Sequence, residues 1–249
     1  MNILRKVLRE NTLWRHYPED RLRWLVWERH NPLARKTFRL GDLEFPYFVH
    51  PYNHTWANER AVEISVVRSF LKASEPAPTL EIGNVLSHYF DMGQTVVDLN
   101  EKCNYRPVIN SDLIEFNPAG RFTRIVSIST FEHIGWDEKP RDEEKIRMAF
   151  PKLKSLLVPG GQAIITVPVG YNLCLDRQVR EASIDNASFR FLKRVSADNL
   201  WVETDLEEAL HCKYGYPFPT ANAIVFIYLN GGSRSPGVQA NRGDGLQRP

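Results

Sequence analysis

Acidic and small polar side chains stand where the predicted strands of this chain end, and their types suit a nucleotide ligand. Glu81 and Gly83 close a first apolar run, Asp98 closes a second, and Asp112 and Leu113 follow a third. In an open parallel sheet, ligands bind beyond the carboxyl ends of the strands, where the strand order reverses. Asp98 can accept hydrogen bonds from both hydroxyls of a ribose, whereas Asp112 and Leu113 suit the amino group and the face of an adenine. Any one acid could be a polar strand cap, but together they predict a nucleotide site.

A histidine and a glutamate follow the fourth predicted strand. Ser129, Glu132 and His133 lie in the short segment that ends this strand. Because imidazole titrates near neutral pH, His133 can act as a general base toward a hydroxyl group. Glu132 can orient the ring or stabilise its charge. The alternative is a structural histidine that bonds backbone at the start of a helix.

Aromatic and polar side chains in two further loops are candidates for binding a second small molecule. His54 and Trp56 precede the first strand, and Tyr171 and Asn172 follow the fifth. Trp136 and Asp137 can cover the cavity. Amphipathic rings with converging polar groups suit a sugar or another polyhydroxyl compound. Core or lid packing is the alternative for each tryptophan taken singly.

Strand patterns alternate with helical patterns along the middle of the chain. We expect strands at 79–82, 95–99, 107–109, 124–129, 162–167, 201–203 and 223–229, and helices at 61–73, 141–157 and 205–212. Such alternation requires crossover connections and a parallel sheet. The fold class predicted is therefore α/β, doubly wound. The pattern weakens over 172–196, which we interpret as an insertion over the site.

The ends of the chain differ in composition from the middle. Residues 1–50 form a basic, aromatic arm in which two short amphipathic helices are expected. Docking of this arm on the domain is favoured over contact with an anionic membrane surface. Residues 51–230 form the main domain, and the glycine-rich residues 231–249 are expected to be disordered.

The overall composition is that of an ordinary globular protein. There are 32 basic and 30 acidic side chains, for a formal net charge of +2, which gives no reason to expect a nucleic-acid partner. The 3 cysteines form no CxxC pair, so neither a disulfide framework nor a thiolate metal site is indicated. No apolar stretch suits a signal sequence or a membrane span. A cytoplasmic protein is expected, and its oligomeric state is left open.

These motifs together resemble class I S-adenosylmethionine-dependent methyltransferases over about residues 61–229. Leu80-Glu81-Ile82-Gly83 is similar to the family's first motif, Asp98 to its ribose-binding acid, and Asp112 to its adenine-side acid. The run 157–162 is similar to the turn before the fifth strand. The resemblance implies a Rossmann-like sheet with an antiparallel final strand at 223–229. It implies a cofactor site for S-adenosyl-L-methionine that includes Leu113 and Ser129.

Two departures from the family pattern bear on the alternatives. Val85 and Ser87 stand where further glycines are usual, and the short interval between Gly83 and Asp98 leaves room only for a short or distorted helix. A dinucleotide needs the missing glycine for its pyrophosphate, so an NAD(P)-dependent oxidoreductase is disfavoured. A catalytically inactive binding protein of the same fold stays open as an alternative.

Glu132-His133 also resembles the adjacent pair of methyltransferases that use a divalent ion. Those families carry another glutamate at the position of Ser129 here, so no metal is predicted. The function expected is methyl transfer to a small acceptor, with an oxygen of a sugar or other polyhydroxyl compound as the acceptor atom. Similarity is greatest to methyltransferases of bacterial surface-glycan synthesis.

Overall fold

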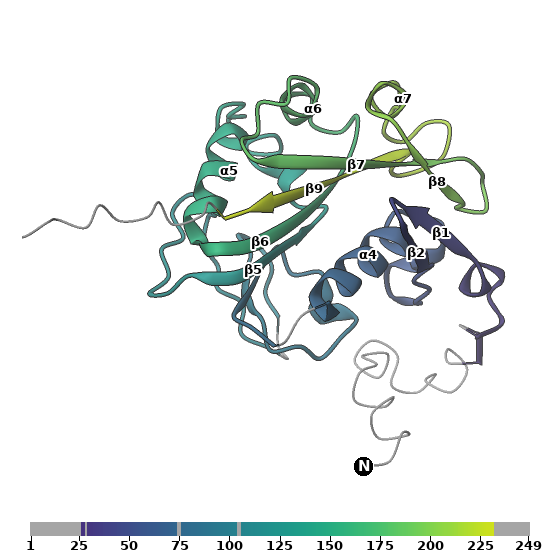
Figure 1. Ribbon diagram of the computed structural model, residues 1–249, viewed down its shortest axis with the longest axis horizontal. Coiled ribbons are helices and arrows are strands. Elements are labelled where there is room, and N and C mark those ends of the chain that lie inside the picture. The colour runs from purple at the N-terminus through teal and green to yellow at the C-terminus, as the bar shows by residue number, and fades with distance from the viewer. Residues whose placement is uncertain (1–25, 28, 74–75, 104–105, 232–249) are drawn as a thin grey trace, which may run out of the picture.

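The computed structural model describes residues 26–27, 29–73, 76–103 and 106–231 and contains a seven-stranded mixed sheet (Figure 1). Its strands are β3 (Thr79–Ile82), β4 (Thr95–Val97), β5 (Phe122–Ile128), β6 (Leu157–Pro168), β7 (Ala187–Arg194), β8 (Trp201–Thr204) and β9 (Ala223–Asn230). They lie in the order β4-β3-β5-β6-β9-β7-β8. The first four are parallel, and β9 is antiparallel to both β6 and β7. The predicted doubly wound sheet with an antiparallel final strand is confirmed.

Alternate residues of the central strands face two cores, because side chains alternate across a sheet. Ile125 and Ile165 pack in the core covered by α5 (Lys145–Leu156), α6 (Leu173–Arg180) and α7 (Leu206–Leu210). Val126 and Ile164 pack in the opposite core, beneath α4 (Arg60–Lys72). Burial on both faces explains why these strands read as continuous apolar runs. Figure 1 shows α5 and α6 on one side of the sheet and α4 on the other.

The described part of the N-terminal arm is built into the second core. After the 3-10 helix η1 (Pro32–Arg35), β1 (Thr37–Leu40) and β2 (Leu43–Pro46) form an antiparallel hairpin. Phe38 and Phe45 of this hairpin are buried against α4. The Tyr47 hydroxyl accepts a hydrogen bond from the Trp201 backbone N–H at 2.8 Å, which links the arm to β8. The helices expected in the arm lie almost entirely outside the described residues, as does the tail beyond Gly231.

Two expectations about the sheet were wrong. The strand expected at 107–109 is reduced to one parallel bridge between Val97 and Ile109, because Pro107 lacks the N–H that a ladder needs. The segment 172–196 is not an insertion, since it contains α6 and the full-length strand β7. At the start of β7, exposed residues alternate with partly buried ones. This segment therefore lacks the continuous apolar run that marks the central strands.

The helix between β3 and β4 is short, as the small interval between Gly83 and Asp98 predicted. The connection contains only the three-residue 3-10 helix η3 (Leu86–His88). In the part of the chain that the structure describes, no helix combines the length and apolarity needed to cross a membrane.

Candidate active site

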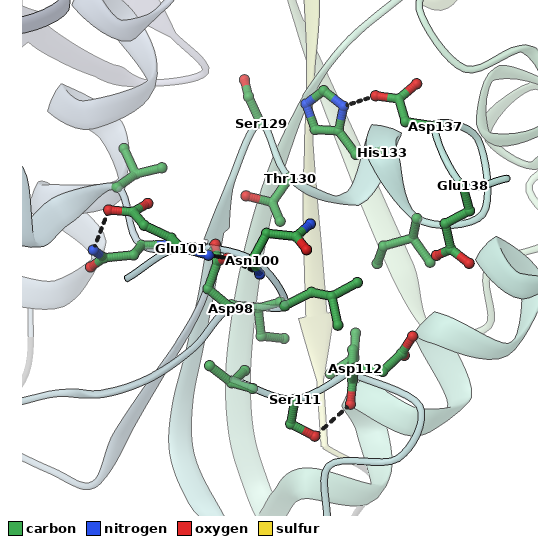
Figure 2. Close-up of a pocket in the computed structure, with 18 of the residues that line it drawn as sticks. Asp98, Asn100, Glu101, Ser111, Asp112, Ser129, Thr130, His133, Asp137 and Glu138 are labelled. Carbon is green, nitrogen blue, oxygen red and sulfur yellow. Dashed lines mark hydrogen bonds and ion pairs between the residues drawn. The ribbon is translucent and has the colours of Figure 1, made fainter. Parts of the chain in front are cut away.

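A cavity of about 470 Å³ opens at the carboxyl ends of β3, β4 and β5. The chain passes from β3 to β4 on one side and returns to β5 on the other, so the strand order reverses between β3 and β5. This is the position at which ligands bind in open α/β sheets. Its lining includes the predicted residues Gly83, Asp98, Asp112, Leu113, Ser129 and His133. Figure 2 shows several of these side chains around the cavity.

Gly83 makes the closest approach between the loops that follow β3 and β5. Its backbone has φ +83°, a left-handed conformation that favours glycine. A Cβ atom at this position would stand 2.1 Å from the Thr130 hydroxyl oxygen. The glycine is therefore required by both the backbone conformation and the contact.

Gly83→Ala is expected to lower the free energy of unfolding by about 2–4 kcal/mol, from left-handed strain and overpacking against Thr130. Denaturant unfolding measures this change. Gly120→Ala is the control, because a Cβ there meets nothing within 4 Å. Equal stabilities for the two variants would show that the loop after β3 is not held against Thr130.

Glu81 lies behind the cavity wall and does not line it. Its carboxylate is fully buried and accepts hydrogen bonds from the backbone N–H groups of Val85 at 2.9 Å and Leu86 at 2.6 Å. Gln94 Nε2 donates to the second oxygen at 2.6 Å. Burial raises the pKa of Glu81, and these hydrogen bonds oppose the shift. Glu81 thus organises the short connection that replaces a longer helix.

Asp98 organises the loop after β4 and contributes to the polar end of the cavity. Its Oδ1 accepts from the backbone N–H groups of Asn100 at 2.9 Å and Glu101 at 2.7 Å, and Oδ2 accepts from Asn84 N–H at 3.2 Å. A carboxylate offers about four lone-pair directions, so Asp98 keeps capacity for a ligand hydroxyl. The neighbouring Leu99 also lines the cavity and is 49% exposed, an apolar surface available to a flat ligand.

Asp112 lines the opposite end of the cavity and is paired with a lysine. Its carboxylate contacts Lys145 Nζ, which also donates to Glu138 Oε1 at 2.6 Å, and it accepts from Ile114 N–H at 2.8 Å. Burial opposes the charge of Lys145, but the two carboxylates raise the pKa of this amine. Leu113 adds apolar lining at the same end.

His133 is held by a carboxylate in the manner of a general base. It lies in the 3-10 helix η4 (Phe131–His133), and its Nδ1 is 2.5 Å from Asp137 Oδ2 (Figure 2). The Tyr171 hydroxyl donates to the same Asp137 oxygen at 2.8 Å. Burial opposes the charge of Asp137, but its hydrogen bonds with His133 and Tyr171 together lower its pKa. Burial and the hydrogen bond to Asp137 raise the pKa of Tyr171 to about 12. An ionised Asp137 keeps the proton on Nδ1 and leaves Nε2 free to accept one.

Glu132 is buried beside His133 and lacks a partner for one oxygen. The residue is 2% exposed, and within the described residues its Oε2 has no hydrogen-bond partner. Its Oε1 is 3.7 Å from His133 Nε2. Burial raises the pKa of Glu132 well above its ordinary value, and the carboxylate of Glu63 adds to the shift.

Glu63 of α4 hydrogen-bonds the segment that directly follows β5. Its Oε1 accepts from the hydroxyls of Ser129 and Thr166, each at 2.7 Å, and its Oε2 is 2.5 Å from Arg60 Nη1. Ser129 has φ +37°, an unusual conformation for serine. Ser129 lines the cavity, and its hydroxyl donates a hydrogen bond to Glu63.

The residues expected to bind a second molecule are only partly brought together. Tyr171 contacts the His133 ring edge-on at 5.0 Å between ring centres. Asn172 is buried, caps α6 and donates to the Glu132 carbonyl at 3.0 Å. Trp136 packs under the Arg141 guanidinium, which lies 3.9 Å from the ring centre. None of these three lines the cavity itself.

His54 and Trp56 belong to the 3-10 helix η2 (Tyr52–Ala57), also outside the cavity lining. Their rings are 5.0 Å apart, and Trp27 packs on Trp56 at 4.2 Å. Asn53 and His54 both have positive φ values, so this loop holds an uncommon backbone conformation of the kind found at functional sites.

Several residues of the site were not among those predicted from the sequence: Glu63, Asn84, Glu101, Thr130 and Lys145. Asp137 was predicted as part of the cover over the cavity, not as the partner of His133. The spacing of His133 and Asp137 is a signal that could have paired them, because a turn brings such residues together. The link from Glu63 to Ser129 joins distant segments and leaves no local sequence pattern.

No family model matches the chain, and no curated protein is significantly similar to it. Solved structures of similar architecture include the N-methyltransferase NodS from Bradyrhizobium japonicum WM9 in complex with S-adenosyl-L-homocysteine, at 15% identity and TM-score 0.45, covering 70% of this chain and 87% of that one. The glycopeptide N-methyltransferase MtfA complexed with sinefungin matches at 13% identity and TM-score 0.42, covering 70% and 96%. An S-adenosylmethionine-dependent methyltransferase from Clostridium acetobutylicum ATCC 824 matches at 12% identity and TM-score 0.36, covering 67% and 89%. These similarities are distant, so the function of this chain has to be read from its own cavity.

Proposed function

We propose that the cavity binds S-adenosyl-L-methionine and that the protein transfers a methyl group to a hydroxyl of a small polyhydroxyl compound. The observation that carries this proposal is the His133–Asp137 pair at the rim of a cavity suited to a nucleoside. A base beside a nucleoside cavity, with no phosphate-binding glycine loop, suits transfer from a cofactor that has no phosphate.

The residues present fit the nucleoside part of this cofactor. Asp98 keeps capacity for a ribose hydroxyl, and Asp112 stands at the other end of the cavity for the adenine amino group. The exposed face of Leu99 can pack on the base. The cavity volume of about 470 Å³ lies within the range of small-molecule sites.

When bound, the cofactor supplies a methyl group already activated on a sulfonium sulfur. The task left to the protein is to align an acceptor oxygen and take its proton. His133 Nε2 accepts that proton while Asp137 stabilises the charged ring through Nδ1. The acceptor oxygen would gain the methyl group that the sulfonium sulfur loses, and the proton of the hydroxyl would pass to His133 Nε2.

His133→Ala is expected to lower turnover by about 10²- to 10⁴-fold, because the variant loses its base. The affinity for S-adenosylhomocysteine should stay within a few-fold, since proton removal belongs to the chemical step. Turnover is measured as S-adenosylhomocysteine released from S-adenosylmethionine with a panel of sugars and polyols. The control is His211→Ala, because His211 is exposed and its Nδ1 contacts only its own helix at Glu207 O. Unchanged turnover per folded His133→Ala molecule would contradict the base assignment.

A further inference from the structure

Asp98 has too few free acceptor positions to bind both hydroxyls of a ribose by itself. Its two oxygens already accept the backbone N–H groups of Asn84, Asn100 and Glu101. A carboxylate offers about four lone-pair directions, so about one is left for a ligand. A ribose presents two hydroxyls on adjacent carbons, and the second hydroxyl needs another acceptor at this end of the cavity.

Glu101 is a second carboxylate at the same end of the cavity (Figure 2). It is linked to Asp98 through Asn84, whose backbone N–H donates to Asp98 Oδ2 at 3.2 Å and whose Nδ2 donates to Glu101 Oε1 at 2.8 Å. The Glu101 backbone N–H also donates to Asp98 Oδ1 at 2.7 Å. The two acidic side chains are therefore held side by side in one short loop and share a neighbour from the loop after β3.

The Glu101 carboxylate is held in place through one of its two oxygens. His88 Nε2 lies 2.7 Å from Oε1, the same oxygen that receives Asn84 Nδ2. The His88 ring stacks on Tyr52 at 4.7 Å between ring centres, and Asn84 is buried. No other described residue donates a hydrogen bond to this carboxylate, and its side chain is 33% exposed. The second oxygen, Oε2, is thus available to accept a hydrogen bond from a ligand.

We infer that Glu101 binds one of the two ribose hydroxyls of the cofactor and that Asp98 binds the other. The inference rests on the proposed function and adds a binding residue to the same site. Ionised carboxylates accept short, strong hydrogen bonds from hydroxyl groups. An acceptor that its neighbours already hold in place loses little conformational freedom when the ligand binds. Together the two acids select a ribose on which both hydroxyls are free.

Calorimetric titration with three ligands tests this inference. The ligands are S-adenosylhomocysteine and its 2′-deoxy and 3′-deoxy analogues, each of which lacks one ribose hydroxyl. They are titrated into the unmodified protein and into Glu101→Gln, which keeps one oxygen for Asn84 Nδ2 and replaces the other by an amide nitrogen. Glu115→Gln is the matched control, because its side chain is exposed and outside the cavity.

We expect the unmodified protein to bind each deoxy analogue roughly 10- to 100-fold more weakly than S-adenosylhomocysteine, because each analogue loses a hydrogen bond to a charged group. Glu101→Gln should weaken S-adenosylhomocysteine by about tenfold, since a neutral amide replaces the charged acceptor. It should leave one of the two analogues unchanged, namely the one that lacks the hydroxyl bound by Glu101. Glu115→Gln should change none of the three.

Two results would overturn the inference. An equal loss for all three ligands in Glu101→Gln would show that Glu101 only holds the loop in place. A deoxy analogue that binds the unmodified protein as tightly as S-adenosylhomocysteine would show that one hydroxyl has no acceptor, and this result needs no variant to fold. A protein that does not bind S-adenosylhomocysteine at all would instead contradict the proposed function.

Discussion

Glu63→Ala is expected to lower the free energy of unfolding by about 3–5 kcal/mol, the cost of breaking a buried ion pair from one side. The change leaves the Arg60 guanidinium, 2.5 Å from Glu63 Oε2, without its carboxylate. It also removes the acceptor of the Ser129 and Thr166 hydroxyls. Burial raises the pKa of Glu63, and the positive charge of Arg60 lowers it. The charged form of Glu63 is therefore stabilised by Arg60. Urea unfolding monitored by circular dichroism measures the loss.

The matched control for this change is Glu144→Ala. Glu144 pairs with Arg147 at 3.4 Å with the same spacing along the chain, but both side chains are exposed. Such a surface pair contributes at most about 1 kcal/mol. Similar losses for the two variants would show that Glu63 does not anchor the end of β5.

Asp98→Ala is expected to weaken S-adenosylhomocysteine binding by roughly 10- to 100-fold. A hydrogen bond to a charged group contributes about 1.5–3 kcal/mol, and each 1.4 kcal/mol corresponds to a factor of ten in affinity. The variant also frees the N–H groups of Asn84, Asn100 and Glu101, which shape the same wall. Isothermal titration calorimetry measures the dissociation constant.

Two comparisons make the Asp98 result specific. Asp98→Asn keeps an oxygen for the backbone N–H groups and should lose less affinity than Asp98→Ala. Glu115→Ala should change nothing, since this exposed side chain lies outside the cavity. An unchanged dissociation constant for Asp98→Ala would remove its assignment as the ribose-binding acid.

The sheet could be predicted because its signals are local. Buried parallel strands read as continuous apolar runs, and the strands at 79–82 and 223–229 lie almost where expected. Strand β7 was missed because neither of its faces is fully buried and its first half is exposed or partly exposed, so its pattern resembles a loop. The hairpin at 37–46 was missed because the strongest signal in the arm was its basic and aromatic composition.

The candidate site was predictable only where residues directly follow strands. Gly83, Asp98, Asp112 and His133 were found in this way, and all four line the cavity. The contacts that orient such residues come from elsewhere in the chain. Glu63 reaches Ser129 from a different helix, and no spacing rule links positions so far apart.

We expect the cavity at the ends of β3, β4 and β5 to bind S-adenosylmethionine. Calorimetric titration of the unmodified protein with S-adenosylhomocysteine, and then with NAD, tests this most directly. We predict saturable binding of S-adenosylhomocysteine at about one site per chain and no binding of NAD, because the phosphate-binding glycine is missing. Binding of NAD in place of S-adenosylhomocysteine, or binding of neither, would contradict an S-adenosylmethionine site in this cavity.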